Sequence, residues 1–260
     1  MLDYIELGTL IAQEAGAIMR KYFRAGKVET YWKADDAPVS QADTEINSLV
    51  LERLHRELPQ FSLIGEEESL PQESEYAAVF DPLDGTLGFT HGVPTFVFSL
   101  AFCHKGNPFA CVVYDPVLDR MFTAEKGKGA LLNGERIRVN QKGLEASTVV
   151  GMAWAKTQGD LAEVQRCLIE KSVFVLQYAS SVYTGCLVAS GMFAASIYPV
   201  KYPWDAASVK LLVEEAGGRA TSITGKNQRY DKAVKGILAA NPVIFDALLS
   251  LVKEKAIITP

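Results

Sequence analysis

The segment Val79-Phe80-Asp81-Pro82-Leu83-Asp84-Gly85-Thr86 constrains this chain more than any other. The apolar run Tyr76–Phe80 predicts a short buried strand, and Pro82, which has no N–H to donate to a sheet ladder, is expected to end it. Asp81 and Asp84 would then project from the end of the strand. An Asp-Gly pair alone is typical of a turn, but a turn requires neither the preceding aspartate nor the following threonine.

The same segment contains the ligand types that a hard cation prefers. Mg²⁺ takes oxygen ligands and usually keeps several waters. Asp81, Asp84 and the backbone carbonyl of Leu83 could supply part of such a shell. Gly85 allows the backbone to approach a ligand closely, and Thr86 adds a hydroxyl. The segment therefore indicates a site for a metal ion and a phosphate.

Two other acidic segments also follow apolar patterns. Gly65-Glu66-Glu67-Glu68 comes directly after the apolar run Phe61–Ile64, and Trp204-Asp205 opens a helical pattern that closes at Glu215-Ala216-Gly217-Gly218. Each acid has an ordinary explanation. Glu66 could be a solvated acid in a loop, and Asp205 could cap a helix that begins at Ala206.

In these three segments the chain resembles the inositol monophosphatase family of Mg²⁺-dependent, lithium-sensitive phosphatases, and the resemblance covers nearly its whole length. The superfamily also includes adenosine 3′,5′-bisphosphate nucleotidases, histidinol-phosphate phosphatases and fructose-1,6-bisphosphatases. The resemblance implies hydrolysis of a phosphate monoester by metal-activated water, without a covalent enzyme intermediate. It implies two or three Mg²⁺ ions, held by Glu66, Asp81, the Leu83 carbonyl, Asp84 and Asp205.

The roles of the remaining candidate residues rest on the same resemblance. Ser40-x-x-Asp43 fits a capping box, which explains Asp43 without any chemistry. The resemblance instead pairs Asp43 with Thr86 to orient the attacking water. It makes Glu67, beside Glu66, a further candidate catalytic residue. Gly85, Thr86 and the amides that follow would bind the phosphate at a helix N-terminus.

Two departures from the family pattern concern the substrate. Gly88 precedes Phe89 where the family commonly has Asn, and Tyr198 stands where inositol-selective members carry a Glu that grips substrate hydroxyls. Tyr198 is predicted to give the substrate an apolar or stacking surface. Tyr198 and the segment Lys33–Ser40 both resemble the corresponding residues of the branch that removes the 3′-phosphate of adenosine 3′,5′-bisphosphate. Lys33–Ser40 resembles the histidinol-phosphate phosphatases as well.

The substrate therefore has several candidates. We expect inositol 1-phosphate or a broad set of small phosphorylated metabolites. The alternatives are a 3′(2′),5′-bisphosphate nucleotidase and a histidinol-phosphate phosphatase. A catalytically silent, metal-binding regulatory domain is the alternative outside the enzymes.

Hydrophobic periodicity predicts two halves, and the resemblance implies that they form one compact catalytic unit. In residues 1–140, two helices precede a largely antiparallel sheet, and this α+β half carries most of the proposed metal ligands. In residues 141–260, strands and helices alternate, and this α/β half contributes Asp205. The resemblance implies that the whole chain forms a layered α-β-α-β-α sandwich.

Composition narrows the choice of partner and compartment. The 260 residues carry a net charge of −5, which disfavours binding to a nucleic-acid backbone. No apolar run is long enough to cross a membrane. The four cysteines form no CxxC pair, so we expect reduced thiols and a cytoplasmic protein. No G-x-G-x-x-G follows a predicted strand, which disfavours a dinucleotide-dependent enzyme. The resemblance suggests a homodimer.

Overall fold

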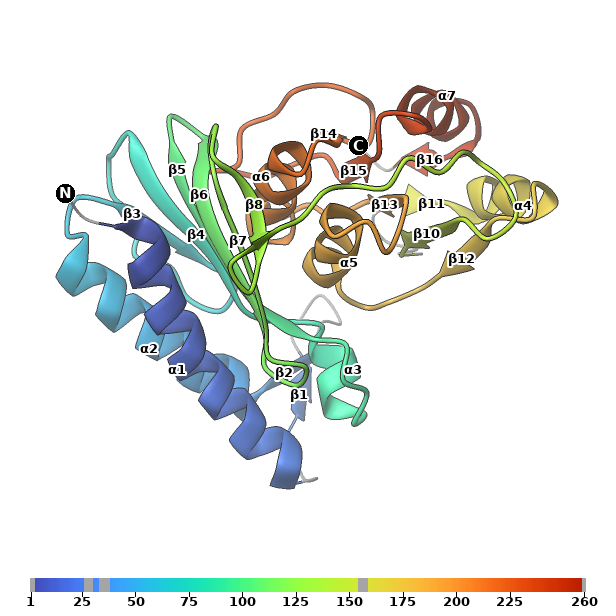
Figure 1. Ribbon diagram of the computed structural model, residues 1–260. Helices are drawn as coiled ribbons and strands as arrows, with labels where there is room; N and C mark the ends of the chain where they lie inside the picture. Colours follow the sequence, from blue (N-terminus) through green and yellow to red (C-terminus); the bar gives the residue numbers. More distant parts are fainter. Residues whose placement is uncertain (1–2, 26–29, 33–37, 154–158, 259–260) are drawn as a thin grey trace.

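The computed structural model describes residues 3–25, 30–32, 38–153 and 159–258, and shows a layered arrangement (Figure 1). Helices α1 and α2 cover the outer face of a large sheet, α5 and α6 lie between this sheet and a smaller one, and α4 and α7 cover the far side. The predicted α-β-α-β-α sandwich is confirmed. Residues 33–37, which carried part of the resemblance to the nucleotidase and histidinol branches, lie outside the described residues.

The helices lie in both halves of the chain, and α3 and α4 are separated by a run of strands. They are α1 (Tyr4–Ala25), α2 (Gln41–Glu57), α3 (Thr86–Thr90), α4 (Ala162–Glu170), α5 (Ser181–Ala189), α6 (Ala207–Glu215) and α7 (Phe245–Lys255), with a 3₁₀ turn η1 (Pro203–Asp205). No described helix is both long and apolar enough to cross a membrane.

The large sheet has seven strands in the order of the chain. They are β3 (Ser62–Gly65), β4 (Tyr76–Asp84), β5 (Val97–His104), β6 (Asn107–Asp115), β7 (Arg120–Glu125), β8 (Gly129–Leu132) and β9 (Glu135–Arg136). Strands β3 and β4 are parallel, and all the other neighbours are antiparallel.

The small sheet has five strands in a mixed order. They are β12 (Phe174–Leu176), β10 (Val149–Met152), β13 (Ala195–Tyr198), β15 (Ile237–Ala240) and β14 (Arg219–Thr221). Strands β12, β10 and β13 are parallel, and β15 runs antiparallel to both of its neighbours. Two further pairs, β1 (Thr30–Trp32) with β2 (Pro38–Ser40) and β11 (Gly159–Asp160) with β16 (Ile257–Ile258), stand apart.

Two helices show why the layers pack so closely. Ile11, Ala15 and Met19 recur on one face of α1 and are fully buried. On the same helix, a Cβ added at Gly16 would come within 2.4 Å of the Tyr114 ring on β6, so glycine is what allows α1 to approach the sheet. Helix α5 is buried at all nine of its positions, because a sheet lies on each side of it.

Strand β4 continues through Pro82 to Asp84, so the prediction that Pro82 ends the strand is wrong. Asp81 pairs with Ser99 and Asp84 pairs with Val97, so β4 advances by three residues where β5 advances by two. This is a β-bulge, and a residue in a bulge need not donate to the ladder, which explains why proline is tolerated. The bulge keeps both aspartates on a buried strand end.

Candidate active site

Three carboxylates that are distant in sequence meet at the end of β4. Asp81 and Asp84 lie on either side of the bulge, and Asp205 ends the turn η1. One carboxylate oxygen from each lies within 4.8 Å of the others. Asp81 and Asp84 are only 2% and 5% exposed. Within the described part of the chain, no lysine or arginine side chain forms an ion pair with Asp81 or Asp84.

The electrostatics of this cluster favour a bound cation. Burial raises the pKa of Asp81 well above its usual range, and the charges of Glu66, Asp84 and Asp205 raise it further. Burial also raises the pKa of Asp84 to about 6, although hydrogen bonds from α5 oppose the rise. A cation between the carboxylates would relieve both the burial cost and the repulsion. The all-oxygen donor set fits a hard divalent ion such as Mg²⁺.

Glu66 belongs to the loop that follows β3. Its side chain is half-buried, and its charge raises the pKa of Asp43, Asp81 and Asp84, which places it beside the cluster. Asn47 of α2, which is buried, tethers this loop: its amide group exchanges two hydrogen bonds of 3.4 Å with the backbone of Glu68. Sequence analysis missed Asn47, although a polar side chain on the apolar face of α2 was a visible signal.

Asp43 serves two neighbours with its two carboxylate oxygens. The backbone N–H of Ser40 donates to Oδ2 at 2.8 Å, as a capping box requires, and the Ser40 hydroxyl donates to the same oxygen. The hydroxyl of Thr86 lies 2.9 Å from Oδ1. The capping explanation and the pairing with Thr86 are therefore compatible. Burial raises the pKa of Asp43 to about 6, while hydrogen bonds from Ser40 and Thr86 lower it.

The N-terminus of α5 holds Asp84 in place. The Ser180 hydroxyl and the backbone N–H groups of Val182 (2.9 Å) and Tyr183 (3.3 Å) all donate to Asp84 Oδ2. Because these bonds converge on one oxygen, Oδ1 is the oxygen that can face a cation. Sequence analysis missed Ser180. A serine before an apolar helix is typical of a cap, but nothing local indicates that its partner is Asp84.

Asp205 lies one residue before the N-cap position of α6, not at the N-cap that the alternative explanation gave it. Helix α6 begins at Ala207 and its N-cap is Ala206, without a capping side chain. Instead, the backbone carbonyl of Asp205 accepts a hydrogen bond of 2.9 Å from the Ser181 hydroxyl on α5. The first turn of α5 therefore contacts two of the three residues of the carboxylate cluster.

Tyr198 is a core residue in this structure. Its side chain is 2% exposed, and its hydroxyl lies 2.8 Å from the Thr184 hydroxyl and 2.9 Å from the Tyr178 carbonyl that accepts its proton. A stacking surface has to be accessible, so the prediction that Tyr198 gives the substrate such a surface is wrong for this geometry. The phenol fills the space behind α5 instead.

The proposed phosphate-binding residues lie where β4 passes into α3. Gly85 has a positive φ of 99°, and a Cβ there would lie 2.5 Å from the Thr95 carbonyl, so this position requires glycine. Thr86 begins α3, and its hydroxyl also lies 3.0 Å from the Leu83 carbonyl. Gly88 lines a depression of about 410 Å³ whose other walls include Leu87, Val93 and Tyr178.

Comparison with known proteins agrees with this geometry. A family model described as the inositol monophosphatase family matches residues 3–256. The chain is 31% identical to the Nus factor SuhB of Pseudomonas aeruginosa, covering 97% of both chains. It is 29% identical to a histidinol-phosphatase of Chlorobaculum parvum, covering 93% of both. The solved structure of an inositol monophosphatase from Anabaena superposes with a TM-score of 0.83 at 28% identity, covering 99% of this chain and 96% of that one.

Proposed function

The chain belongs to the inositol monophosphatase family, and on that premise we propose that it is a Mg²⁺-dependent phosphomonoesterase acting on small phosphorylated metabolites. One observation carries the proposal: the cluster of Asp81, Asp84 and Asp205 lies next to the Asp43–Thr86 pair. A cation site alone would not require a buried carboxylate that is paired with a hydroxyl beside it.

We assign the metal ligands to the acidic cluster and its two neighbours. Glu66, Asp81, Asp84, Asp205 and the carbonyl of Leu83 would hold two or three ions. Bound Mg²⁺ would neutralise charge on the phosphoryl oxygens and lower the pKa of a coordinated water. Glu67, half-buried in the loop after β3, would help to position Glu66, its neighbour in the sequence.

Asp43 and Thr86 would orient the attacking water. The Thr86 hydroxyl has one proton, so at any moment it can donate a hydrogen bond either to Asp43 Oδ1, at 2.9 Å, or to the Leu83 carbonyl, at 3.0 Å. While it donates to Asp43, the Thr86 oxygen can still accept a hydrogen bond from a water. The raised pKa of Asp43, about 6, suits a group that takes a proton near neutral pH. The backbone of Gly85 and Thr86 would hold the phosphate.

The leaving group would face the depression beside α3. Its lining residues include Leu87, the neighbour of Thr86 in the sequence, and Ala179, the neighbour of Ser180. Its walls at Leu87, Val93 and Tyr178 are largely apolar. A weakly polar wall discriminates less among leaving groups than a carboxylate that hydrogen-bonds to sugar hydroxyls. Gly88 adds to its width, because it lacks the side chain that an Asn would place there. These features favour broad specificity, with inositol 1-phosphate among the substrates.

The decisive experiment measures Mg²⁺ binding and phosphate release separately. The substrates are inositol 1-phosphate, adenosine 3′,5′-bisphosphate, histidinol phosphate, fructose 1,6-bisphosphate and 2′-AMP. We expect turnover of several of them. A strong preference for adenosine 3′,5′-bisphosphate or histidinol phosphate would select that alternative. Mg²⁺ binding without any turnover would favour the regulatory-domain alternative, which the name of the Pseudomonas relative, Nus factor SuhB, brings into consideration. Light scattering on the same sample tests the proposed homodimer.

A further inference from the structure

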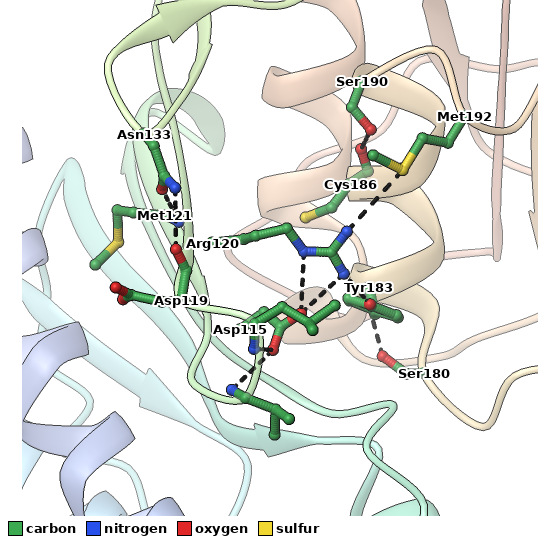
Figure 2. A network of polar contacts seen from close by, with 12 residues as sticks. Asp115, Asp119, Arg120, Met121, Asn133, Ser180, Tyr183, Cys186, Ser190 and Met192 are labelled. Atoms are coloured by element: carbon green, nitrogen blue, oxygen red, sulfur yellow. Dashed lines mark hydrogen bonds and ion pairs between the residues drawn. The ribbon is translucent and has the colours of Figure 1, made fainter.

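An ion pair between a buried aspartate and a partly buried arginine joins two strands of the large sheet (Figure 2). Asp115 ends β6 and is fully buried, and Arg120 begins the neighbouring strand β7. The guanidinium donates twice to Asp115 Oδ2, from Nη2 at 2.9 Å and from Nε at 3.2 Å. The other oxygen, Oδ1, accepts the backbone N–H groups of Val117 and Leu118, each at 3.0 Å. Asp115 therefore fixes the direction of the guanidinium.

The same guanidinium reaches across to α5. Its Nη2 also donates to the hydroxyl of Tyr183, and its central carbon lies 5.4 Å from the centre of the Tyr183 ring. Tyr183 is 6% exposed, and Figure 2 shows it beside Ser180, at the start of the helix. The backbone N–H of Tyr183 donates to Asp84 Oδ2 at 3.3 Å. One residue of α5 thus contacts Arg120 with its side chain and the carboxylate cluster with its backbone.

We propose that Arg120 is a positioning residue for the metal site, because it fixes the first turn of α5 through Tyr183 and thereby sets the orientation of Asp84. This inference rests on the proposed function, since it takes Asp84 as a metal ligand. A planar guanidinium can bond to a carboxylate and a phenol in fixed directions, whereas a lysine ammonium cannot. Removal of a group that orients a metal ligand typically weakens metal affinity about 10–100-fold.

The test measures the Mg²⁺ dissociation constant of the substrate-free protein by calorimetry, and the melting temperature in EDTA. We expect Arg120→Met to bind Mg²⁺ about 10-fold more weakly than wild type, at the low end of that range because Arg120 acts through Tyr183. Tyr183→Phe, which removes only the hydroxyl, should show a smaller loss in the same direction. Arg166→Met is the matched control, because Arg166 also pairs with a carboxylate, Glu163, but on the exposed surface of α4.

A double variant separates positioning from stability. Arg120→Met leaves Asp115 buried without its cation, so its melting temperature should fall. Asp115→Asn with Arg120→Met removes both charges and should recover part of that temperature while Mg²⁺ binding stays weak. Mg²⁺ affinity within about twofold of wild type in this double variant and in Tyr183→Phe would overturn the inference and leave Arg120 a stabilising residue only. A wild-type protein that binds no Mg²⁺ would instead overturn the proposed function, and this inference with it.

Discussion

Asp43→Asn is the substitution that best separates catalysis from folding. It keeps the shape of the side chain and removes its charge. The structure also shows how asparagine can fit: its carbonyl can accept the two hydrogen bonds from Ser40, and its NH₂ can donate to Thr86. The Thr86 hydroxyl would then donate to the Leu83 carbonyl, 3.0 Å away. The capping box survives, but Thr86 can no longer pass a proton to residue 43.

The expected effects on rate and stability have opposite signs. Loss of a general base typically lowers kcat by about 10²–10⁴-fold. The folded state holds Asp43 at a pKa of about 6, against 3.8 as its ordinary value. Without metal at pH 7, the ionised carboxylate therefore costs the folded state about 3 kcal/mol, a cost that asparagine avoids. A residue that only capped α2 would behave differently: kcat would stay unchanged, because asparagine can still accept the hydrogen bonds of the capping box.

The assay measures kcat for phosphate release with saturating Mg²⁺, and the melting temperature in EDTA at pH 7. We expect kcat to fall at least about 100-fold while the melting temperature stays equal or rises. Asp3→Asn is the control, because Asp3 accepts the backbone N–H groups of Ile5 and Glu6 at the exposed start of α1. A variant at Asp43 with nearly wild-type kcat would refute the reasoning and leave Asp43 as a cap, whatever its melting temperature.

Four other predictions follow from the site. Activity should disappear in EDTA, return with Mg²⁺ and fall with Li⁺; phosphate release after exhaustive chelation would contradict the metal site. Asp84→Asn should abolish turnover without lowering the melting temperature in EDTA, a combination that a turn residue would not show. In EDTA, stability should rise as pH falls from 7 to 5, because the pKa values of Asp43 and Asp84, raised to about 6 from 3.8, make the folded state bind protons more tightly than the unfolded state. Mg²⁺ should remove that rise in melting curves. Tyr198→Phe should cost about 1 kcal/mol through lost hydrogen bonds and leave the ranking of substrates by kcat/KM unchanged.

The layered fold was predictable because its helices and strands have local sequence patterns, and because longer motifs resemble those of a known family. Apolar residues at helical spacing in α1, and the strand followed by acids at Asp81 and Asp84, are visible within short windows. The family resemblance added the arrangement of the layers. The error at Pro82 came from treating the strand alone, since only pairing with β5 reveals the bulge that accommodates proline.

The sequence by itself determined the kinds of groups that the site contains: carboxylates on a strand end, a glycine and a hydroxyl after them, and further acids on two other segments. Only the tertiary structure decided which of these groups meet. Asp84 finds its partners 96 to 99 residues away, at the N-terminus of α5, and Thr86 finds Asp43 at a separation of 43 residues. Tyr198 is buried for the same reason. Such contacts depend on how sheets and helices pack, and local periodicity carries no information about the distance between segments that are far apart in the chain.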